Sequence, residues 1–278
     1  MNHYENFKSY EFLPRSNETR FDEGGIRFKN NSKKVKNLYP FISIITVVKN
    51  GEKYLEETIK SVINQTYKNY EYIVIDGGSK DKTLDIIKKY SDKIDYWVSE
   101  TDKGLYDAFN KGMQLAKGDF IGIINSDDVY LSKTLEILKK YINNNPNIDF
   151  IFGSVKKHWG ILHGYRPEKI GYSWGFYSSH STGFFIKNES AKKIGKYNLK
   201  YKYHADYDYF YRMIVKNKMH GISTKKHEIT GIFRRGGFSS KIPYRKLDTN
   251  LLDNIEKLKD KQKNILTNLI SQNIQILK

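Results

Sequence analysis

Cysteine is absent from the 278-residue chain, and this absence excludes disulfide bonds, thiolate catalysis and zinc sites that need cysteine ligands. No apolar run reaches the roughly 18–20 residues that a membrane-spanning helix needs. The first residues, MNHYENFKSYEF, contain no apolar segment of the kind that a secretion signal carries. These absences predict a protein of the cytoplasm, and they are compatible with peripheral contact at the inner face of the cell membrane.

Acidic residues are outnumbered, since 48 lysines and arginines stand against 31 aspartates and glutamates, a net charge of +17. A charge of this sign favours an anionic partner such as a nucleotide, a nucleic acid or a phospholipid headgroup. Nearly all of the excess is lysine, whereas arginine is scarce. Arginine is the better ligand for phosphates and guanine edges, because its planar guanidinium donates two parallel hydrogen bonds. Compositional drift towards lysine therefore explains the charge as well as a functional surface does.

Short apolar runs alternate with helical patterns from residue 41 onwards. Residues 1–38 show no sustained period, so we expect an N-terminal arm or a poorly ordered lead-in there. Four strand–helix units in succession predict an α/β sandwich with a mostly parallel central sheet. The strands are predicted at 41–48, 72–76, 94–99 and 120–124, and the helices at 54–63, 83–90, 105–116 and 132–142.

Polar and acidic residues follow the predicted strands. Lys49 comes after the first strand, Asp76 ends the second, and Asp102 follows the third. Asp127 and Asp128 stand side by side after the fourth strand. Ligands of such sheets bind at the carboxyl ends of the strands, so we expect these side chains to line a ligand site.

The usual phosphate-binding glycine loops are missing. The chain has no G-x-x-x-x-G-K-[ST], and DGGSKD after the second strand is not G-x-G-x-x-G. An acidic rim would repel a diphosphate unless Mg²⁺ or Mn²⁺, held by one or two carboxylates and by the phosphates, lay between them. Asp76 can instead accept a hydrogen bond from a ribose hydroxyl or a base N–H. A loop-forming role is the alternative for any single aspartate, but several acidic strand ends together favour a nucleotide-diphosphate site.

Two segments, FISIITVVKNGEKYLEETIKSVINQTYKNYEYIVIDGGSKDKT and SETDKGLYDAFNKGMQLAKGDFIGIINSDDVY, resemble the nucleotide-binding half of family 2 glycosyltransferases with the GT-A fold. The resemblance rests on motif order and spacing over roughly residues 40–240. It implies a Rossmann-like GT-A domain at 39–240, in which 39–130 bind the nucleotide and 131–240 supply the acceptor and catalytic half. Residues 241–278 are then a C-terminal helical extension.

The resemblance also implies residues for the nucleotide. Asp76 contacts the base, typically uracil, and Asp102 lies near the nucleotide. Many relatives have a second aspartate where this chain has Gly77. The nucleotide-binding residues that the resemblance implies are Val47, Lys49, Asp76, Asp102, Ser126 and Asp127.

Metal ligands follow from the same resemblance. Asp127 occupies the metal-binding position of the D-x-D-type motif, whose first aspartate is Asn125 in this chain. Asp128 shares the metal or the ribose. His180, in SSHSTGFFIK, completes the metal shell or touches the diphosphate in some relatives, although a lone histidine is more often structural. Mn²⁺ or Mg²⁺ is the expected cofactor.

An inverting sugar transfer needs a base that takes the proton of the acceptor hydroxyl as its oxygen attacks the anomeric carbon. The segment HADYDYFYRMIV (204–215) begins a predicted helix, and Asp206 matches the position of the family's catalytic carboxylate. Ala205 stands where a glutamate often precedes it, and Asp208 is the second candidate. Helix N-capping is the structural alternative for Asp206, because aspartate is a favoured cap.

Three further segments admit two interpretations each. Arg234 and Arg235, flanked by glycine, form either a basic loop that clamps the diphosphate or a solvated turn. The aromatic stretch 158–177 forms either an acceptor platform or a lid packed on the core. Apolar residues spaced in a heptad-like pattern over 251–276 predict helices that pack back on the domain, or else a homodimer contact or a basic membrane-surface helix.

The resemblance implies an inverting, metal-dependent glycosyltransferase that moves a sugar from a UDP-linked donor to a glycan or lipid-linked acceptor. Polysaccharide or lipopolysaccharide assembly is the implied setting. A sugar nucleotidyltransferase is the alternative enzyme, but it is expected to have a glycine-rich basic loop where this chain has VVKNGEKY. A nucleic-acid-binding protein predicts a stripe of arginine and aromatic residues, whereas the marked features here are acidic, so no nucleic-acid partner is expected.

Overall fold

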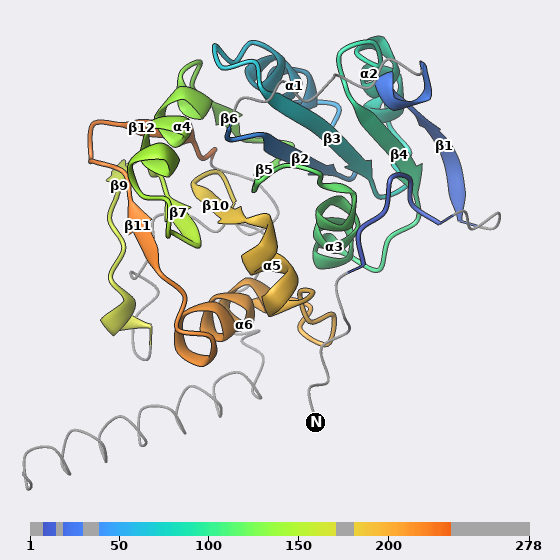
Figure 1. The fold of residues 1–278 in the computed structure, drawn as a ribbon. Helices are drawn as coiled ribbons and strands as arrows, with labels where there is room; N and C mark the ends of the chain where they lie inside the picture. The colour runs from blue at the N-terminus through green and yellow to red at the C-terminus, as the bar shows by residue number, and fades with distance from the viewer. Residues whose placement is uncertain (1–7, 15–18, 30–38, 171–180, 235–278) are drawn as a thin grey trace, which may run out of the picture.

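The computed structural model describes residues 8–14, 19–29, 39–170 and 181–234. Its centre is an eight-stranded sheet in the order β1-β4-β3-β2-β5-β10-β7-β11 (Figure 1). The strands β4, β3, β2 and β5 are parallel to one another, whereas β1 and β10 run antiparallel to their neighbours. The strands are β1 Arg20–Gly24, β2 Ile42–Val48, β3 Tyr70–Asp76, β4 Tyr96–Glu100, β5 Phe120–Asn125, β7 Phe150–Phe152, β10 Phe184–Lys187 and β11 Gly221–Ser223.

The middle strand, β2, is buried along its whole length, as its β-branched sequence ISIITVV predicts for a strand covered on both faces. Its register places Ile45 beside Ile73 of β3 and beside Ile123 of β5. The four predicted strand–helix units are confirmed, and so is the α/β sandwich with its mostly parallel sheet.

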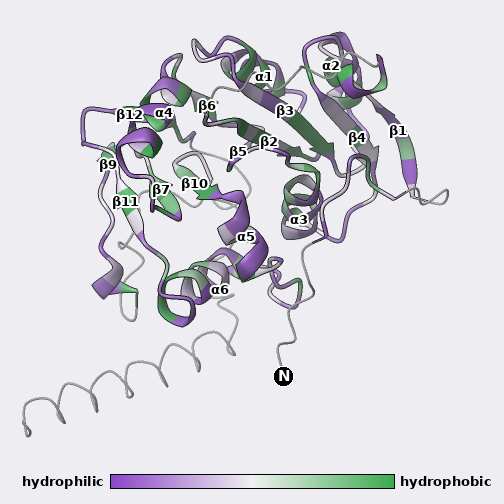
Figure 2. Cartoon of the chain, viewed as in Figure 1, coloured by the Kyte–Doolittle hydropathy of each residue, from purple (hydrophilic) through white to green (hydrophobic). Residues whose placement is uncertain are grey.

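Helices cover both faces of the sheet (Figure 1). The helices α1, α2 and α4 pack on one face, and α3, α5 and α6 pack on the other. Hydrophobic residues gather on the central strands, and hydrophilic residues mark the outer sides of the helices (Figure 2). The helices are α1 Leu55–Ile63, α2 Thr83–Lys89, α3 Leu105–Leu115, α4 Thr134–Asn144, α5 Asn188–Ile194 and α6 Ala205–Tyr211, with the short helices η1 Ile26–Lys29, η2 Pro167–Lys169 and η4 Arg212–Lys216.

A smaller four-stranded sheet, in the order β6-β12-β8-β9, lies beside the main one. The main sheet is continuous across the chain, because β10 pairs antiparallel with β5. The segments expected to form the nucleotide-binding half and the acceptor half therefore share one sheet. The strands of the smaller sheet are β6 Val129–Tyr130, β8 Ser154–Lys157, β9 Gly160–Leu162 and β12 Ile229–Ile232.

Part of the segment expected to be an N-terminal arm belongs to the main sheet, because β1 pairs antiparallel with β4. The guanidinium of Arg20 donates to the carboxylate of Glu100 at 2.9 Å and to that of Glu23 at 3.0 Å. The expectation of an arm is therefore wrong for residues 20–24. Their sequence, RFDEG, has no apolar period, and the strand is fixed by a partner in a distant part of the chain.

Several sequence-predicted features lie outside the described residues. They include His180, Arg235, residues 171–177 of the aromatic stretch and the whole C-terminal extension at 241–278. None of the helices in the described part of the chain has the length and apolar content that crossing a membrane requires.

Candidate functional site

The carboxyl ends of β2, β3, β4 and β5 lie together at one edge of the sheet, because these strands are parallel neighbours. Lys49 follows β2, Asp76 ends β3, and Asp102 follows β4. Asn125 ends β5, and Asp127 comes two residues later. The predicted convergence of polar and acidic residues on one edge is confirmed.

Asp76 is completely buried. Its carboxylate accepts hydrogen bonds from the hydroxyl of Ser79 at 2.5 Å and from the hydroxyl of Ser99 at 2.6 Å. The main-chain N–H of Ser79 donates to it as well, at 3.2 Å. Asp76 therefore orders the loop after β3 and ties it to β4, which is the loop-forming alternative to a contact with a base.

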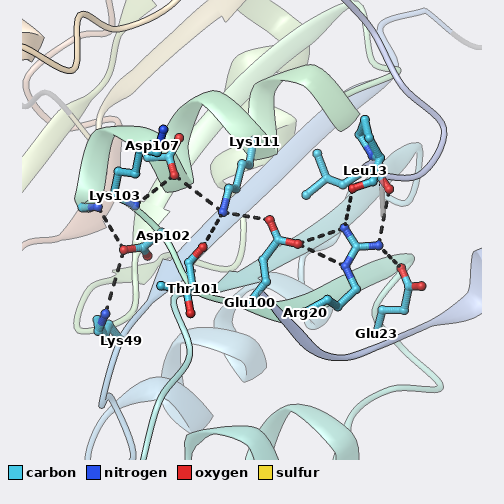
Figure 3. Close-up of polar contacts among 12 residues, drawn as sticks. Leu13, Arg20, Glu23, Lys49, Glu100, Thr101, Asp102, Lys103, Asp107 and Lys111 are labelled. Carbon is cyan, nitrogen blue, oxygen red and sulfur yellow. Dashed lines mark hydrogen bonds and ion pairs between the residues drawn. The ribbon is translucent and has the colours of Figure 1, made fainter. Parts of the chain in front are cut away.

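Asp102 packs against Gly77 in the next loop. A Cβ atom at position 77 would lie only 2.0 Å from Oδ2 of Asp102, so the carboxylate fills the space of the missing side chain. The main-chain N–H of Gly104 donates to Oδ1 at 3.0 Å, and Nζ of Lys49 lies 4.0 Å from the same oxygen (Figure 3). Burial raises the pKa of Asp102 above its ordinary value.

An ion-pair network supports the segment that carries Asp102 (Figure 3). Nζ of Lys111, on α3, lies 2.8 Å from Oε1 of Glu100 and 3.6 Å from Oδ2 of Asp107. Arg20 of β1 donates to the other oxygen of Glu100 at 2.9 Å. The network joins β1, β4 and α3, so the loop between β4 and α3 is held at both of its ends.

Asp128 is only 1 % exposed, and both of its carboxylate oxygens bond within the protein. The hydroxyl of Thr182 donates to Oδ2 at 2.5 Å, and the main-chain N–H of Arg234 donates to Oδ1 at 3.0 Å. Burial, followed by the charge of Asp127, raises the pKa of Asp128 to about 7. Asp128 thus ties the loop after β5 to the segments before β10 and after β12. Its role as a metal or ribose ligand, which the resemblance implies, stays a prediction.

A metal ion at this edge would need ligands from the substrate. The described residues contain no group of three or more histidine or acidic side chains that could hold a metal ion. Burial raises the pKa of Asp127, and Oδ1 of Asn125 is buried without a hydrogen-bond partner in the described part of the chain. The amide nitrogen of Asn125 donates to the hydroxyl of Ser181 at 3.2 Å. A carboxylate and an unpaired amide oxygen are donors that suit Mg²⁺ or Mn²⁺ alongside substrate phosphates.

Asp206 lies at the start of α6 and contacts α3. The hydroxyl of Tyr106 donates to Oδ1 of Asp206 at 3.1 Å, and the main-chain N–H of Tyr207 donates to the same oxygen at 3.0 Å. Burial, followed by the charge of Asp206, raises the pKa of Tyr106 well above its ordinary value. Asp206 is not the helix N-cap, because His204 occupies that position.

Asp208, the second candidate base, belongs to a buried ion pair. Nε of Arg212 donates to its Oδ2 at 2.9 Å, and the Arg212 side chain is 2 % exposed. The remaining guanidinium N–H groups donate to the carbonyls of Ile194 and Lys196. Asp208 therefore balances the charge of a guanidinium that is itself buried.

Three more of the predicted site residues, Arg234, Val47 and Ser126, have contacts within the protein. The guanidinium of Arg234 pairs with Glu57 and lies 4.8 Å from the ring centroid of Tyr54. Val47 is buried in the core on β2. The carbonyl of Ser126 accepts a hydrogen bond from a threonine of α1 at 2.9 Å.

Only part of the aromatic stretch is described. The ring of Tyr165 packs edge-on against Phe150, with centroids 5.2 Å apart, whereas Trp159 is 61 % exposed. Tyr165 therefore packs on the core, as one of the two interpretations of this stretch predicts.

Sequence reasoning missed Tyr106 and Thr182 as partners of the site aspartates. Tyr106 falls on the apolar face of a predicted helix, where an aromatic residue is expected to be core. Thr182 has no sequence signal that separates it from any other strand-flanking threonine. In both cases the contact joins residues that are far apart in the chain.

Comparison with known proteins places the chain among glycosyltransferases. The family model described as Glycosyl transferase family 2 matches residues 43–217. An uncharacterized glycosyltransferase of Methanocaldococcus jannaschii is 33 % identical over 192 residues, which are 64 % of this chain and 66 % of that protein. A PGL/p-HBAD biosynthesis glycosyltransferase of Mycobacterium tuberculosis is 28 % identical over 207 residues, which are 69 % of this chain and 79 % of the relative.

Two solved structures share the fold. S. aureus TarS 1-349 in complex with UDP-GlcNAc has a TM-score of 0.61 at 20 % identity, over 73 % of this chain and 61 % of that one. The mannosyltransferase PcManGT from Pyrobaculum calidifontis, in complex with GDP-Man and Mn²⁺, has a TM-score of 0.54 at 16 % identity, over 76 % of this chain and 59 % of that one. The chain thus spans less than two thirds of these two structures and of the M. jannaschii protein. Since the family model covers more than half of its residues, the chain belongs to glycosyltransferase family 2.

Proposed function

We propose that the protein is a glycosyltransferase that moves a sugar from a UDP-linked donor to a hydroxyl of a glycan or lipid-linked acceptor, with inversion at the anomeric carbon. The observation that carries this proposal is the placement of two carboxylates. Asp127 lies at the carboxyl edge of the parallel sheet, and Asp206 lies on a helix that α3 holds from the other half of the domain. The first suits the diphosphate of a donor, and the second suits the hydroxyl of an acceptor.

The nucleotide lies along the edge of the sheet in this proposal. Its diphosphate is at the end of β5, near Asp127, and its nucleoside points towards β2, β3 and β4, where Lys49 and Asp102 follow the strands. TarS was solved with UDP and with UDP-GlcNAc, which supports a uridine donor. PcManGT was solved with GDP-Man, so GDP is the competitor that a binding experiment must include.

Asp127 and Asn125 are the residues that would hold Mn²⁺ or Mg²⁺. The bound cation would stabilise the negative charge that develops on the departing diphosphate. Asp128 acts indirectly, because its bonds to Thr182 and to the main chain of Arg234 keep the loop after β5 in place. The Mn²⁺ in the PcManGT complex supports this dependence on metal.

Asp206 acts as the general base. It accepts the proton of the acceptor hydroxyl while that oxygen forms a bond to the anomeric carbon. The bond between the anomeric carbon and the diphosphate oxygen breaks, and its electron pair leaves with the diphosphate. One displacement on the face opposite the leaving group inverts the configuration of the sugar.

A relative of known pathway and the charge of the chain support an acceptor class and a location. The mycobacterial relative is a PGL/p-HBAD biosynthesis glycosyltransferase, which supports a lipid-linked or cell-envelope acceptor. The net charge of +17 suits an anionic membrane surface, so we place the protein in the cytoplasm with peripheral contact at the inner face of the membrane. A homodimer through the segment 241–278 is part of the same proposal.

Calorimetric titration tests the donor site. UDP is titrated into the protein with Mn²⁺ and then with EDTA, and GDP and CDP are titrated in parallel. We expect metal-dependent binding of UDP, loss of that binding in Asp127→Ala, and its retention in Asp206→Ala. Release of UDP from a panel of UDP-sugars in the presence of acceptor should disappear in Asp206→Ala. Absence of UDP binding, or UDP binding that EDTA leaves unchanged, contradicts the proposal.

A further inference from the structure

The turn between α5 and α6 has a leucine and a lysine at its corner. The side-chain oxygen of Asn198 accepts the main-chain N–H of Lys200 at 3.0 Å, and the carbonyl of Asn198 accepts the N–H of Tyr201 at 3.2 Å. Residues 198–201 thus form a tight turn whose two central positions are Leu199 and Lys200. Leu199 is 44 % exposed, and Lys200 is exposed as well. An apolar side chain at such a corner contributes little to the core.

The residue before the turn anchors it to the body of the domain. The ring of Tyr197 is buried and stacks on the rings of Tyr106 and Tyr209, with centroids 5.6 and 4.2 Å away. The N–H of Tyr197 donates to the side-chain oxygen of Asn110 at 2.8 Å, and the amide nitrogen of Asn110 donates to the carbonyl of Tyr197 at 3.0 Å. The exposed corner therefore stands on a well-packed base.

Lysines surround the turn. Residues 187–202 contain six lysines and one acidic residue. Lysines in the last turn of α5 suit the helix dipole, but Lys200 and Lys202 lie beyond the end of that helix. This basic surface lies on the side of the sheet that carries α5 and α6, away from α1 and α2 (Figure 1). The six lysines are Lys187, Lys192, Lys193, Lys196, Lys200 and Lys202.

A basic surface with an apolar corner fits an anionic membrane. Lysine ammonium groups bind the phosphates of anionic lipids, and an apolar side chain enters the boundary between headgroups and acyl chains. The backbone phosphates of a nucleic acid would engage the lysines but would offer no apolar partner to Leu199. The apolar corner is therefore the feature that favours a lipid surface.

The turn is also close to the proposed base. Asp206 follows Leu199 by seven residues, and seven residues of chain span at most about 25 Å. A protein that rests on a membrane through this turn therefore holds the start of α6 within about 25 Å of the lipid headgroups. The hydroxyl of a lipid-linked acceptor is found in that range.

We propose that the turn at 198–201 and the lysines around it dock the protein on an anionic phospholipid surface, with Leu199 inserted at the level of the headgroups. This inference rests on the proposed function for its lipid-linked acceptor. It assigns the part of the protein that faces the membrane, and it places the acceptor half of the domain there.

Vesicle sedimentation tests the surface. The full-length protein is mixed, without donor or acceptor, with vesicles of phosphatidylcholine alone or of phosphatidylcholine with about one third phosphatidylglycerol. We expect binding to the anionic vesicles that is at least about 10-fold tighter than binding to the neutral ones. Each lysine at an anionic surface changes the partition coefficient about five-fold, so Lys192→Ala/Lys193→Ala/Lys200→Ala should lower it about 100-fold.

A second triple variant is the matched control. Lys68→Ala/Lys93→Ala/Lys133→Ala removes the same charge from exposed lysines that follow α1 and α2 and precede α4. It should lower the partition coefficient less than about three-fold, because salt screens charges that are far from the docked surface. Equal losses in the two triple variants would show a general effect of net charge and would overturn the proposal.

The absence of cysteine allows the insertion of Leu199 to be tested directly. Leu199→Cys gives the chain a single thiol, to which an environment-sensitive fluorophore is attached. Its emission should shift to the blue on anionic vesicles and stay unchanged on neutral ones. Leu131→Cys is the control, at a leucine that is 37 % exposed and precedes α4, and it should show no shift. No shift from position 199 overturns the insertion.

Titration of UDP with Mn²⁺ into the same variants separates this inference from the proposed function. A lysine variant of the turn that binds UDP normally but has lost the vesicles supports the docking surface. If that variant binds UDP and also keeps the wild-type partition, the donor site stands and the docking surface is overturned. If the wild type binds vesicles through these lysines but binds no UDP, the donor is refuted and the docking surface is not.

Two other occupants of the surface are distinguished in the same way. Binding of a short DNA duplex that the lysine variant loses, without binding to vesicles, assigns the surface to a nucleic acid and overturns the proposal. A dimer in analytical ultracentrifugation that Leu199→Ala dissociates, again without binding to vesicles, assigns the surface to a second copy of the chain and likewise overturns it.

Discussion

The hydrogen bond from Tyr106 to Asp206 allows the proposed base to be tested by removing a single atom. The hydroxyl of Tyr106 lies 3.1 Å from Oδ1 of Asp206, and both residues are about nine-tenths buried. Tyr106→Phe keeps the ring, which stacks on Tyr197 with centroids 5.6 Å apart. The change therefore removes one donor to the carboxylate and leaves the packing between α3 and the segment before α6 in place.

The size of the effect follows from the charge of the acceptor. Hydrogen bonds to charged groups contribute about 1.5–3 kcal/mol, which corresponds to about a 10- to 150-fold change in rate if the bond holds Asp206 in its reactive orientation. We expect kcat to fall by this factor, with the Kd for UDP unchanged.

The matched control is Tyr72→Phe. Tyr72 is also buried, and its hydroxyl shares a 2.9 Å hydrogen bond with Thr46 in the core on the opposite face of the sheet. This variant should lose about 1 kcal/mol of stability and keep the wild-type kcat. UDP release and the Kd for UDP are measured for both variants and for Asp206→Asn. Wild-type kinetics in Tyr106→Phe beside an inactive Asp206→Asn would refute the positioning argument, and an active Asp206→Asn would refute the base itself.

Three further predictions concern stability and metal. The pKa of Asp128 is raised to about 7 in the folded state, so the folded protein holds a proton that the unfolded chain releases above about pH 4. The free energy of unfolding should therefore fall as the pH rises from about 4 towards 7, by up to about 4 kcal/mol. Urea unfolding in EDTA measures this loss, which should be absent in Asp128→Asn. Arg212→Leu leaves the carboxylate of Asp208 buried without its partner, and urea unfolding should show a loss of about 3–5 kcal/mol; a loss below about 1 kcal/mol contradicts the structural role of this pair. EDTA should weaken UDP binding at least about 10-fold and leave uridine binding unchanged, since the cation contacts only the diphosphate.

The order of strands and helices was predictable from the sequence because each element carries its own signal. A strand buried on both faces needs a continuous apolar run, and β2 has one in ISIITVV. The helices between the strands carry apolar residues at helical spacing, which is enough to place them on a sheet. Once the strands are parallel neighbours, the residues that follow them must meet at one edge, so the location of the site was also determined by the sequence.

The strand β1 shows where local signals end. Its five residues, RFDEG, have no apolar alternation, and the strand exists because β4 offers an open edge and Glu100 offers a partner for Arg20. Nothing in residues 20–24 alone distinguishes this segment from an exposed arm. Edge strands that depend on ion pairs with distant residues are visible only when those residues have been brought together.

The sequence alone determined that the chain places aspartates at the ends of parallel strands and at the start of α6, and that it has the motifs of family 2 glycosyltransferases. Only the tertiary structure decided which donors hold each of those aspartates. Asp76 and Asp128 are occupied by hydroxyl and N–H donors that lie 3 to 106 residues away in the chain, and Asp208 is taken by Arg212. Asp206 is instead held by a phenol 100 residues away. Four of the donors, namely Ser99, Thr182, Tyr106 and the main chain of Arg234, lie 23 to 106 residues from their carboxylates, so packing brings them there and not their place in the sequence.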